Sequence, residues 1–377
     1  MTEDPQQAPH PRRSRGLHLP APSARRAVVI GAGSFGTAVA ILLSRAGLRT
    51  TLQTRTEDQA RRLRDDHENH AYLSGVELPR DLRIETIGAG IGRADYVFLS
   101  VPSPSVREVI ESLEQHGLSS SAAVISLTKG LVPPDGALPS AILRQRFGVL
   151  RTACLGGPAH AREMVGAGAG LVAASDSEAL ARSLAQIFLD AGVVCEESGD
   201  PVGVELAGVA KNAAALASGA TVAQGLNAAG AAAGHIFAEV WRWARANGAR
   251  PESMIGLAGT GDLVATALAP ESRNRRAGEL LAEGIPAREI PQRVGQAVEA
   301  LQTVPLLAGD LTRGGIDAPV TVALAGLIEG AMPLEQWVSV VRTTIPPAAR
   351  RGPRRGRLRR VWSALVSLIL GRTRRQR

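Results

Sequence analysis

The sequence of 377 residues is poor in aromatic residues and in cysteine. Aromatic side chains make up only 3% of it, so we expect a core built from alanine, valine, leucine and isoleucine. The two cysteines, Cys154 and Cys195, are too few for a disulfide framework, and their spacing is not that of zinc ligands. We therefore expect two buried, reduced thiols and no metal site.

Long apolar runs are also missing. No stretch reaches the roughly 18 apolar residues of a membrane-spanning helix. The N-terminus is rich in proline and polar residues and lacks the apolar core of a secretory signal. We expect a disordered leader over residues 1–25 and a soluble, cytoplasmic protein.

The net charge of +8 is unevenly distributed. Arg350 to Arg377 contains eleven arginines and no acid, whereas Ala27 to Ala349 carries a net charge of −6. An acidic body argues against nucleic acid as a partner. The basic tail, residues 346–377, contains the short apolar segment Val361 to Leu370. This tail is either an interfacial helix in weak contact with an anionic membrane surface or a disordered extension.

Short apolar runs alternate with helical patterns in the first half of the chain. The alternation is typical of an α/β fold with a parallel sheet and right-handed crossovers. One helix is expected at Thr37 to Arg45. The expected strands are Ala27 to Ile30, Thr50 to Gln53, Tyr96 to Val101, Ala122 to Leu127, Thr152 to Leu155 and Gly170 to Ala174.

The second half is rich in alanine and has helical periodicity. It covers Val202 to Ala246, Ala277 to Glu283 and Val294 to Leu307. We therefore predict two domains. Residues 26–197 would form a Rossmann-like dinucleotide-binding domain, and residues 198–345 an all-helical substrate and catalytic domain.

The first expected strand leads into a glycine-rich turn and then a helix, the context that a dinucleotide site requires. In the segment Gly31-Ala32-Gly33-Ser34-Phe35-Gly36, Gly31 permits a tight turn and Gly33 lets the backbone approach a pyrophosphate. Gly36 allows close packing of the helix on the strand, and the N–H groups of Ser34 and Phe35 face the anion. The alternative is a glycine-rich turn without a ligand.

An acidic residue that would bind the adenine ribose is missing about 20 residues further on. The segment Leu52 to Thr56 places Arg55 there instead. A guanidinium can pair with the 2′-phosphate of NADP, so we expect NADP to be at least tolerated beside NAD. The alternative is an ordinary surface arginine.

Lysine is nearly absent. Of 43 basic residues only Lys129 and Lys211 are lysines, so this chain uses arginine for its surface charge. Arginine cannot lose its proton near neutral pH, whereas lysine can. The two remaining lysines therefore indicate positions where a compact or titratable ammonium is needed.

Several motifs, in order along the chain, resemble those of the bacterial NAD(P)-dependent glycerol-3-phosphate dehydrogenases. The resemblance extends from about Ala27 to Thr343. The motifs are Gly31 to Gly36, Asn69 to Pro79, Val101 to Ser103 with Arg107, Thr128 to Gly130, Gly157-Pro158, Gly203 to Leu206, Lys211-Asn212, Gly256 to Leu263 with Thr266, and Ser272 to Arg275.

The resemblance implies reversible hydride transfer between NAD(P)H and dihydroxyacetone phosphate. The product, sn-glycerol 3-phosphate, would serve phospholipid synthesis. The resemblance further implies that the enzyme is a homodimer. It makes Lys211 the proton donor in reduction and the acceptor in oxidation. Lys129 would support the carbonyl oxygen between nicotinamide and substrate. Asp262 would orient Lys211 and bind a substrate hydroxyl.

The resemblance also implies the binding residues. Those for the substrate, beside the three catalytic residues, are Gly157, Asn212, Thr266, Ser272, Arg273 and Asn274. Those for the cofactor, beside the glycine-rich turn and Arg55, are Lys129, Ala161, Arg273 and Glu299. Arg273 and Asn274 would hold the substrate phosphate.

Two positions depart from the family pattern. Ala159 and His160 stand where the family has a hydroxyl residue and then Phe, and Gly234-His235 stand where it has Thr-Arg. The missing hydroxyl leaves open a paralogous dehydrogenase for another small phosphorylated or 2-oxo substrate. A cofactor-binding protein without catalysis is a further alternative. His160 as general base fits less well than Lys211.

Overall fold

The computed structural model describes residues 25–269 and 272–345. The basic tail and the predicted leader, apart from Arg25, lie outside the described residues. The described residues up to Arg342 belong to one compact unit. None of the helices found in the described segments combines the length and the apolar character needed to cross a membrane.

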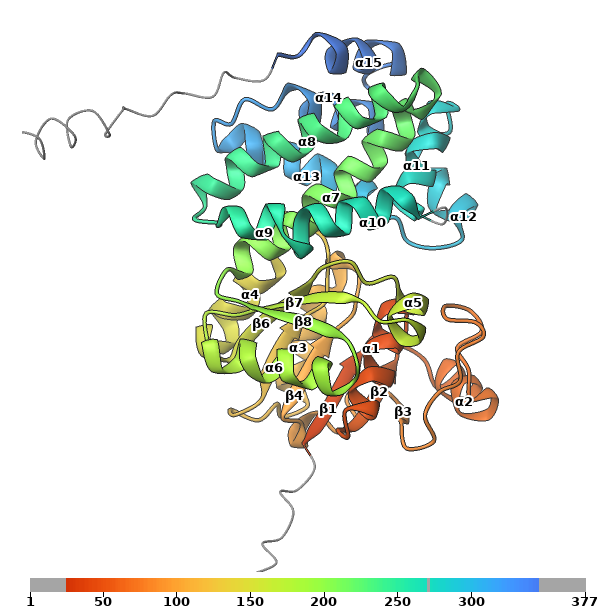
Figure 1. Cartoon of the computed structure of the whole chain (residues 1–377). Coiled ribbons are helices and arrows are strands. Elements are labelled where there is room, and N and C mark those ends of the chain that lie inside the picture. The colour runs from red at the N-terminus through yellow and green to blue at the C-terminus, as the bar shows by residue number, and fades with distance from the viewer. Residues whose placement is uncertain (1–24, 270–271, 346–377) are drawn as a thin grey trace, which may run out of the picture. The chain divides into compact units, whose positions relative to one another are not determined.

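A single sheet of eight strands organises the N-terminal half (Figure 1). Its order is β3-β2-β1-β4-β5-β6-β7-β8, and the first five neighbours have the order of a dinucleotide-binding fold. This confirms the predicted Rossmann-like architecture. The strands are β1 (Arg26–Ile30), β2 (Arg49–Thr54), β3 (Arg83–Thr86), β4 (Tyr96–Leu99), β5 (Ala123–Ser126), β6 (Thr152–Gly156), β7 (Gly170–Ala174) and β8 (Val194–Ser198).

The order in which strands are added to the sheet reverses at β1, which lies between β2 and β4. Ile30 at the end of β1 pairs with Gln53 of β2 and with Leu99 of β4. Ligands of open α/β sheets bind outside the carboxyl ends of the strands at such a switch point. The glycine-rich turn that follows Ile30 is therefore at the expected ligand edge.

The predicted parallel sheet has one exception among the described strand pairs, because β7 pairs with β6 antiparallel. The only helix between them, α5 (Ala161–Gly166), has six residues. Such a helix is about 9 Å long, whereas a strand of five residues spans about 16 Å. The helix is too short to return the chain to the start of a parallel neighbour.

Apolar side chains cover both faces of the sheet. Val29 and Phe98 point into one cluster, and Val28 and Val97 into the other, as the alternation of a strand requires. Both cysteines are buried and free, as predicted. The helices of this half, besides α5, are α1 (Ser34–Arg45), α2 (Glu57–Asp66), α3 (Val106–Gln115), α4 (Pro139–Phe147) and α6 (Glu178–Asp190).

The C-terminal half is helical, as predicted, and its large core also includes Cys154 of β6 and Val172 and Ala174 of β7. The expected helix from Val294 to Leu307 is wrong at its start, because Gly295 adopts a left-handed conformation (φ +74°) and ends α12. The helices are α7 (Pro201–Thr221), α8 (Leu226–Ala246), α9 (Pro251–Ile255), α10 (Asp262–Leu268), α11 (Arg273–Ala282), α12 (Ile290–Val294), α13 (Glu299–Arg313), α14 (Pro319–Ile328) and α15 (Leu334–Thr343). The predicted boundary between residues 197 and 198 stays a prediction.

A buried carboxyl joins the start of α7 to the start of α4. Glu205 accepts hydrogen bonds from the backbone N–H of Ser140 (3.0 Å) and from its hydroxyl (2.5 Å). Burial raises the pKa of Glu205 to about 7, although the bonds from Ser140 oppose the shift. Because its pKa in the folded protein exceeds the ordinary 4.5, Glu205 stabilises the fold below pH 4.5, and this contribution is lost as pH rises through 7.

We expect Glu205→Gln to remove the loss of stability that the wild type shows as pH rises through 7. Between about pH 5 and about pH 8 the free energy of unfolding should fall by on the order of 3 kcal/mol more in the wild type than in the variant. Urea titrations at both pH values measure it, with Glu108→Gln on the exposed side of α3 as control. Parallel pH dependences of wild type and Glu205→Gln would contradict the assignment.

Candidate active site

The glycine-rich turn joins β1 to α1 and is shaped for an anion. A Cβ at Gly31 (φ +108°) would lie 2.2 Å from the backbone oxygen of Ser100, and one at Gly36 would lie 2.0 Å from that of Gly31. Gly33 has no atom within 4 Å of its Cβ position, so space is open there. No side chain caps the N-terminus of α1. Free N–H groups beside open space fit the pyrophosphate of a dinucleotide.

A second motif holds this turn in place. Asn69, the first residue of the segment that ends at Pro79, is buried. Its amide donates to the backbone oxygen of Ala32 (3.0 Å) and to the hydroxyl of Thr37 (2.8 Å). The side chain therefore ties the turn to the first helical residues of α1, which keeps the anion site preformed.

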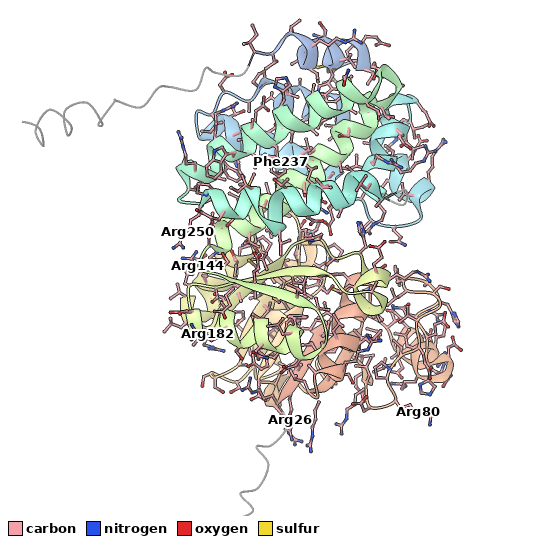
Figure 2. All side chains as sticks on the ribbon, viewed as in Figure 1. Arg26, Arg80, Arg144, Arg182, Phe237 and Arg250 are labelled. Carbon is pink, nitrogen blue, oxygen red and sulfur yellow. The ribbon has the colours of Figure 1, made fainter. Side chains whose placement is uncertain are left out.

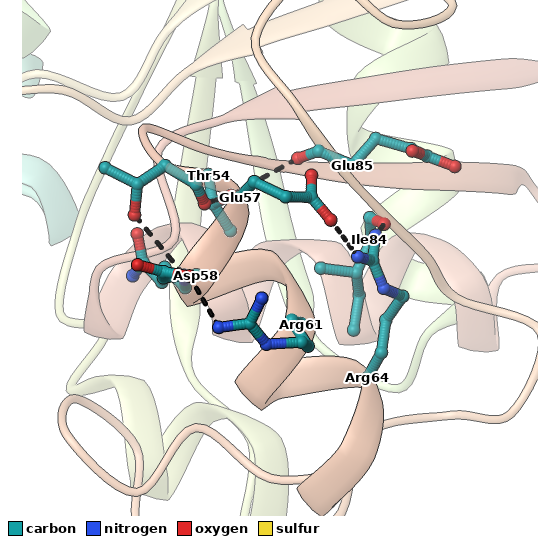
Figure 3. A network of polar contacts seen from close by, with 9 residues as sticks. Thr54, Glu57, Asp58, Arg61, Arg64, Ile84 and Glu85 are labelled. Carbon is teal, nitrogen blue, oxygen red and sulfur yellow. Dashed lines mark hydrogen bonds and ion pairs between the residues drawn. The ribbon is translucent and has the colours of Figure 1, made fainter.

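The two acids at the start of α2 are already paired, whereas Arg55 has no polar partner among the described residues. Glu57 and Asp58 of α2 pair with Arg64 and Arg61 of the same helix (Figure 3). Arg55 is exposed and forms no hydrogen bond or ion pair with the residues that the structure describes. Its guanidinium is thus available to a ligand at the edge where the adenine ribose would lie.

Lys129 follows β5 and lies at the same edge of the sheet. Its Nζ donates to Asp262 Oδ2 at 2.8 Å and to the backbone oxygen of Gly157 at 3.2 Å. It also lies 5.7 Å from the centroid of the Phe35 ring, within cation–π range. These contacts fix an ammonium between the glycine-rich turn and the helical half.

Lys211 lies in the middle of α7, a helix of 21 residues that is buried almost throughout. Its side chain is 10% exposed, and its Nζ is 3.5 Å from Asp262 Oδ2. Burial lowers the pKa of Lys211 to about 8, and the positive charge of Lys129 acts in the same direction, against the attraction of Asp262. At this pKa the amine gains and loses a proton near physiological pH.

A short π-helix positions Asp262. Residues Leu257–Gly261 form this turn immediately before α10. Gly259 passes so close to the preceding backbone that a Cβ would lie 2.0 Å from the oxygen of Met254. The hydroxyl of Thr260 donates to the same oxygen at 3.1 Å. Such π turns are frequent at functional sites, and here the turn directs Asp262 toward both lysines.

The carboxylate of Asp262 is the centre of the site. Burial raises its pKa, but the charges of Lys129 and Lys211 outweigh that effect, and the net pKa is lowered. Oδ2 serves both lysines, while Oδ1 accepts a 3.5 Å contact from the Thr266 hydroxyl. The carboxylate is therefore ionised and neutralises one of two neighbouring ammonium groups.

A chain of amides extends from the lysines to α13. Asn212 donates to the backbone oxygen of Lys129 and to Glu299 Oε2, both at 3.0 Å. Asn274 donates to Asn212 Oδ1 at 2.9 Å and accepts from the backbone N–H of Ala300 at 3.2 Å. These bonds lock the polar residues beside the lysines into one orientation.

Glycines let α11 approach α7 closely enough for this contact. A Cβ at Gly219 would lie 2.0 Å from the backbone oxygen of Arg275, and one at Gly278 would lie 2.0 Å from that of Leu216. Any larger residue would push the two helices apart. The glycines of both helices thus allow Asn274 to reach Asn212.

Comparisons with known proteins identify the family of the chain. The family model for the N-terminus of NAD-dependent glycerol-3-phosphate dehydrogenase matches residues 26–181, and the model for its C-terminus matches residues 200–339. The chain belongs to this family. It is therefore an NAD(P)-dependent oxidoreductase, and the cofactor prediction is confirmed.

Individual members of the glycerol-3-phosphate dehydrogenase family resemble most of the chain. A glycerol-3-phosphate dehydrogenase [NAD(P)+] of Deinococcus radiodurans is 38% identical over 309 residues, which cover 80% of this chain and 90% of the relative. One from Teredinibacter turnerae is 35% identical over 79% of this chain and 89% of its own length. The crystal structure of glycerol-3-phosphate dehydrogenase from Coxiella burnetii has a TM-score of 0.81 at 27% identity, covering 86% of this chain and all of the other.

Not all residues predicted from the family join the lysine cluster. Ser272 is buried, and its hydroxyl caps α11 by accepting from the N–H of Arg275. Arg273 is exposed and donates to the backbone oxygen of Ala297 at 3.2 Å. Ala161 begins α5. The binding roles of these residues stay predictions.

The contrast between lysine and arginine predicted from composition is visible in the structure. Arginines such as Arg26, Arg80 and Arg182 are exposed (Figure 2), whereas the side chains of Lys129 and Lys211 are 18% and 10% exposed. Both lysines contact the same carboxylate. Both lysines of the chain therefore lie in the candidate site.

Two buried polar atoms near the site belong to residues outside the predicted set of site residues. His160 Nε2 and Thr303 Oγ1 are buried and lack a hydrogen-bond partner within the described segments. The Thr303 hydroxyl would lie 2.9 Å from a Cβ at Gly130, the residue after Lys129. The only sign in the sequence was that His160 departs from the family pattern.

Proposed function

We propose that the protein catalyses the reversible reduction of dihydroxyacetone phosphate to sn-glycerol 3-phosphate by NAD(P)H. The observation that carries the proposal is the buried Asp262 carboxylate shared by the two lysines of the chain, at 2.8 and 3.5 Å. A carbonyl that gains a hydride becomes an alkoxide, which needs a nearby cation and a proton. The two lysines are suited to these two tasks.

Lys211 is the proton carrier of this proposal. Its pKa of about 8 means that the ammonium and the amine are both accessible near neutral pH. Lys211 Nζ would give its proton to the C2 oxygen in reduction and take it back in oxidation. Asp262 keeps the protonated form available by opposing the effect of burial.

Lys129 would stabilise the developing charge on the same oxygen. Its ammonium is held by Asp262 and by the backbone oxygen of Gly157, so little reorganisation is needed when the charge forms. The cofactor supplies the hydride when it is bound. Gly31, Gly33 and Gly36 would hold its pyrophosphate.

The substrate phosphate is assigned to Arg273 and Asn274. Arg273 is exposed, and a guanidinium can grip a phosphate with two hydrogen bonds. Asn274 is fixed by Asn212 and by the N–H of Ala300, so its position relative to the lysines is set before substrate arrives. This assignment rests on the family motif Ser272 to Arg275.

The direct experiment follows oxidation of NADPH and of NADH by the purified protein with dihydroxyacetone phosphate. Turnover that depends on this substrate supports the proposal. No turnover by the folded protein would contradict it, and turnover only with another small 2-oxo compound would favour the paralogous dehydrogenase. Against an inactive cofactor-binding protein stands the complete set of Lys129, Lys211 and Asp262 in mutual contact.

We further propose that Arg55 makes NADP an efficient cofactor. Arg55→Ala should lower kcat/KM for NADPH by about tenfold or more while leaving that for NADH nearly unchanged, because a charge-assisted bond to the 2′-phosphate is lost. Arg62→Ala, an exposed arginine of α2 without an ion pair in the described residues, is the matched control. An unchanged ratio of NADPH to NADH efficiency in Arg55→Ala would contradict this role.

The proposed setting is a cytoplasmic homodimer whose product enters phospholipid synthesis. The cytoplasm is supported by the two free, buried cysteines. The homodimer and the lipid role rest on the family resemblance. Weak contact of the tail, residues 346–377, with a membrane surface stays a prediction.

A further inference from the structure

The loop that carries His160 is fixed from three sides. The backbone oxygen of Gly157 accepts from Lys129 Nζ at 3.2 Å. The backbone oxygen of Pro158 accepts from Gly170 at 3.2 Å, and that of His160 accepts from Met164 at 2.8 Å. The loop therefore holds its shape, and the backbone fixes the point from which the His160 side chain extends.

His160 lies in the loop that contacts the charged centre of the site, because Gly157 of the same loop binds Lys129. After the larger effects of burial and the two lysines, a positive charge on His160 would lower the pKa of Asp262. Nε2 is buried, yet it has no hydrogen-bond partner among the described residues. A buried polar atom without a partner costs about 1–3 kcal/mol, so such atoms are found where a ligand or water completes the bond.

The chemistry of the neighbours selects the ligand group. Asp262 is ionised and would repel a phosphate, whereas a hydroxyl can donate to its carboxylate and also bond an imidazole nitrogen. The neighbouring Ala159 offers no hydroxyl of its own. The substrate phosphate is assigned elsewhere, to Arg273 and Asn274. The remaining polar group of a three-carbon phosphorylated ketone is its free primary hydroxyl.

We propose that His160 Nε2 forms a hydrogen bond with the free primary hydroxyl of the substrate. This bond would favour a substrate with that hydroxyl over an analogue with a methyl group in the same place. The inference rests on the proposed function. His160 acts here as a specificity residue. A site built to bond a hydroxyl disfavours an analogue that lacks it, because the buried partner is then left unpaired.

The test compares dihydroxyacetone phosphate with hydroxyacetone phosphate, which has a methyl group in place of the free hydroxymethyl. The variants are His160→Phe, which cannot form the bond, and His160→Gln, whose amide can replace Nε2. We expect His160→Phe to lower kcat/KM for dihydroxyacetone phosphate by about tenfold with little change for the deoxy analogue, so that the selectivity ratio falls about tenfold. His160→Gln should restore much of the ratio.

Each outcome is decisive. An unchanged selectivity ratio in His160→Phe, or equal losses on both substrates, would overturn the role of His160 while leaving the proposed function intact. Wild type without activity on either substrate would instead overturn the proposed function. Retained turnover of the deoxy analogue shows that His160→Phe is folded. His70→Phe, at an exposed histidine, is the matched control.

Discussion

Replacing Lys211 with Met lowers kcat for reduction of dihydroxyacetone phosphate by about 10²–10⁴-fold, the usual contribution of a positioned acid or base. The methionine fills the buried space in α7 but carries no proton. Since Lys211 contacts Asp262 and is proposed to act only on the substrate oxygen, affinity for NADPH should change little. Steady-state kinetics with saturating NADPH measure the effect.

Lys211→Arg separates charge from proton transfer. Arginine keeps the cation beside Asp262 but does not release a proton near neutral pH, so the arginine variant should be nearly as slow as the methionine variant. NADPH binding, followed by fluorescence, is the control that both variants are folded. Turnover within about tenfold of wild type in Lys211→Met would remove Lys211 from the mechanism.

The second large effect is expected at Asp262. Asp262→Asn leaves the ammonium groups of Lys129 and Lys211 close together without a counter-charge. Loss of an opposite charge at this distance lowers a lysine pKa by about 1–3 units, so the break in the pH profile of reduction should move to lower pH by that amount. Activity near neutral pH should fall by about 10²-fold or more because Lys211 is then deprotonated and Lys129 is no longer oriented.

A matched control is Asp176→Asn, which removes one acid from a partly exposed pair with Arg144 far from the lysine cluster in sequence. It should leave the pH profile unchanged, since partly exposed ion pairs contribute little. If Asp262→Asn were as active as wild type with an unshifted profile, the shared carboxylate would have no role in setting the pKa of Lys211.

The sequence predicted the parts of the fold that are buried and repetitive. The apolar run of β1, the glycine-rich turn and α1 could be placed because each has its own pattern. Strands β3 and β8 were missed because they lie at the two edges of the sheet, where each has a single buried residue, Ile84 and Cys195. An edge strand needs no continuous apolar run, so its pattern is weak.

The residues of the proposed site and the pairing of Asp262 with Lys211 could be predicted, but most of the other contacts could not. Family motifs indicated Lys129, Lys211 and Asp262, and the scarcity of lysine gave independent support. The contact of Asn212 with Asn274 could not be predicted, because it depends on the close packing of α7 on α11. The spacing of residues along the chain did not indicate that α11 packs on α7.

The most direct measurement of the central claim is the pH dependence of kcat/KM in both directions, from about pH 6 to about pH 10. Reduction needs protonated Lys211, so it should be constant below about pH 8 and fall about tenfold per pH unit above the pKa of that lysine. Oxidation needs the neutral amine, so it should rise up to about pH 8 and then level off. Profiles without a break between about pH 7 and about pH 9, or the same break in Lys211→Arg, would contradict Lys211 as the proton carrier.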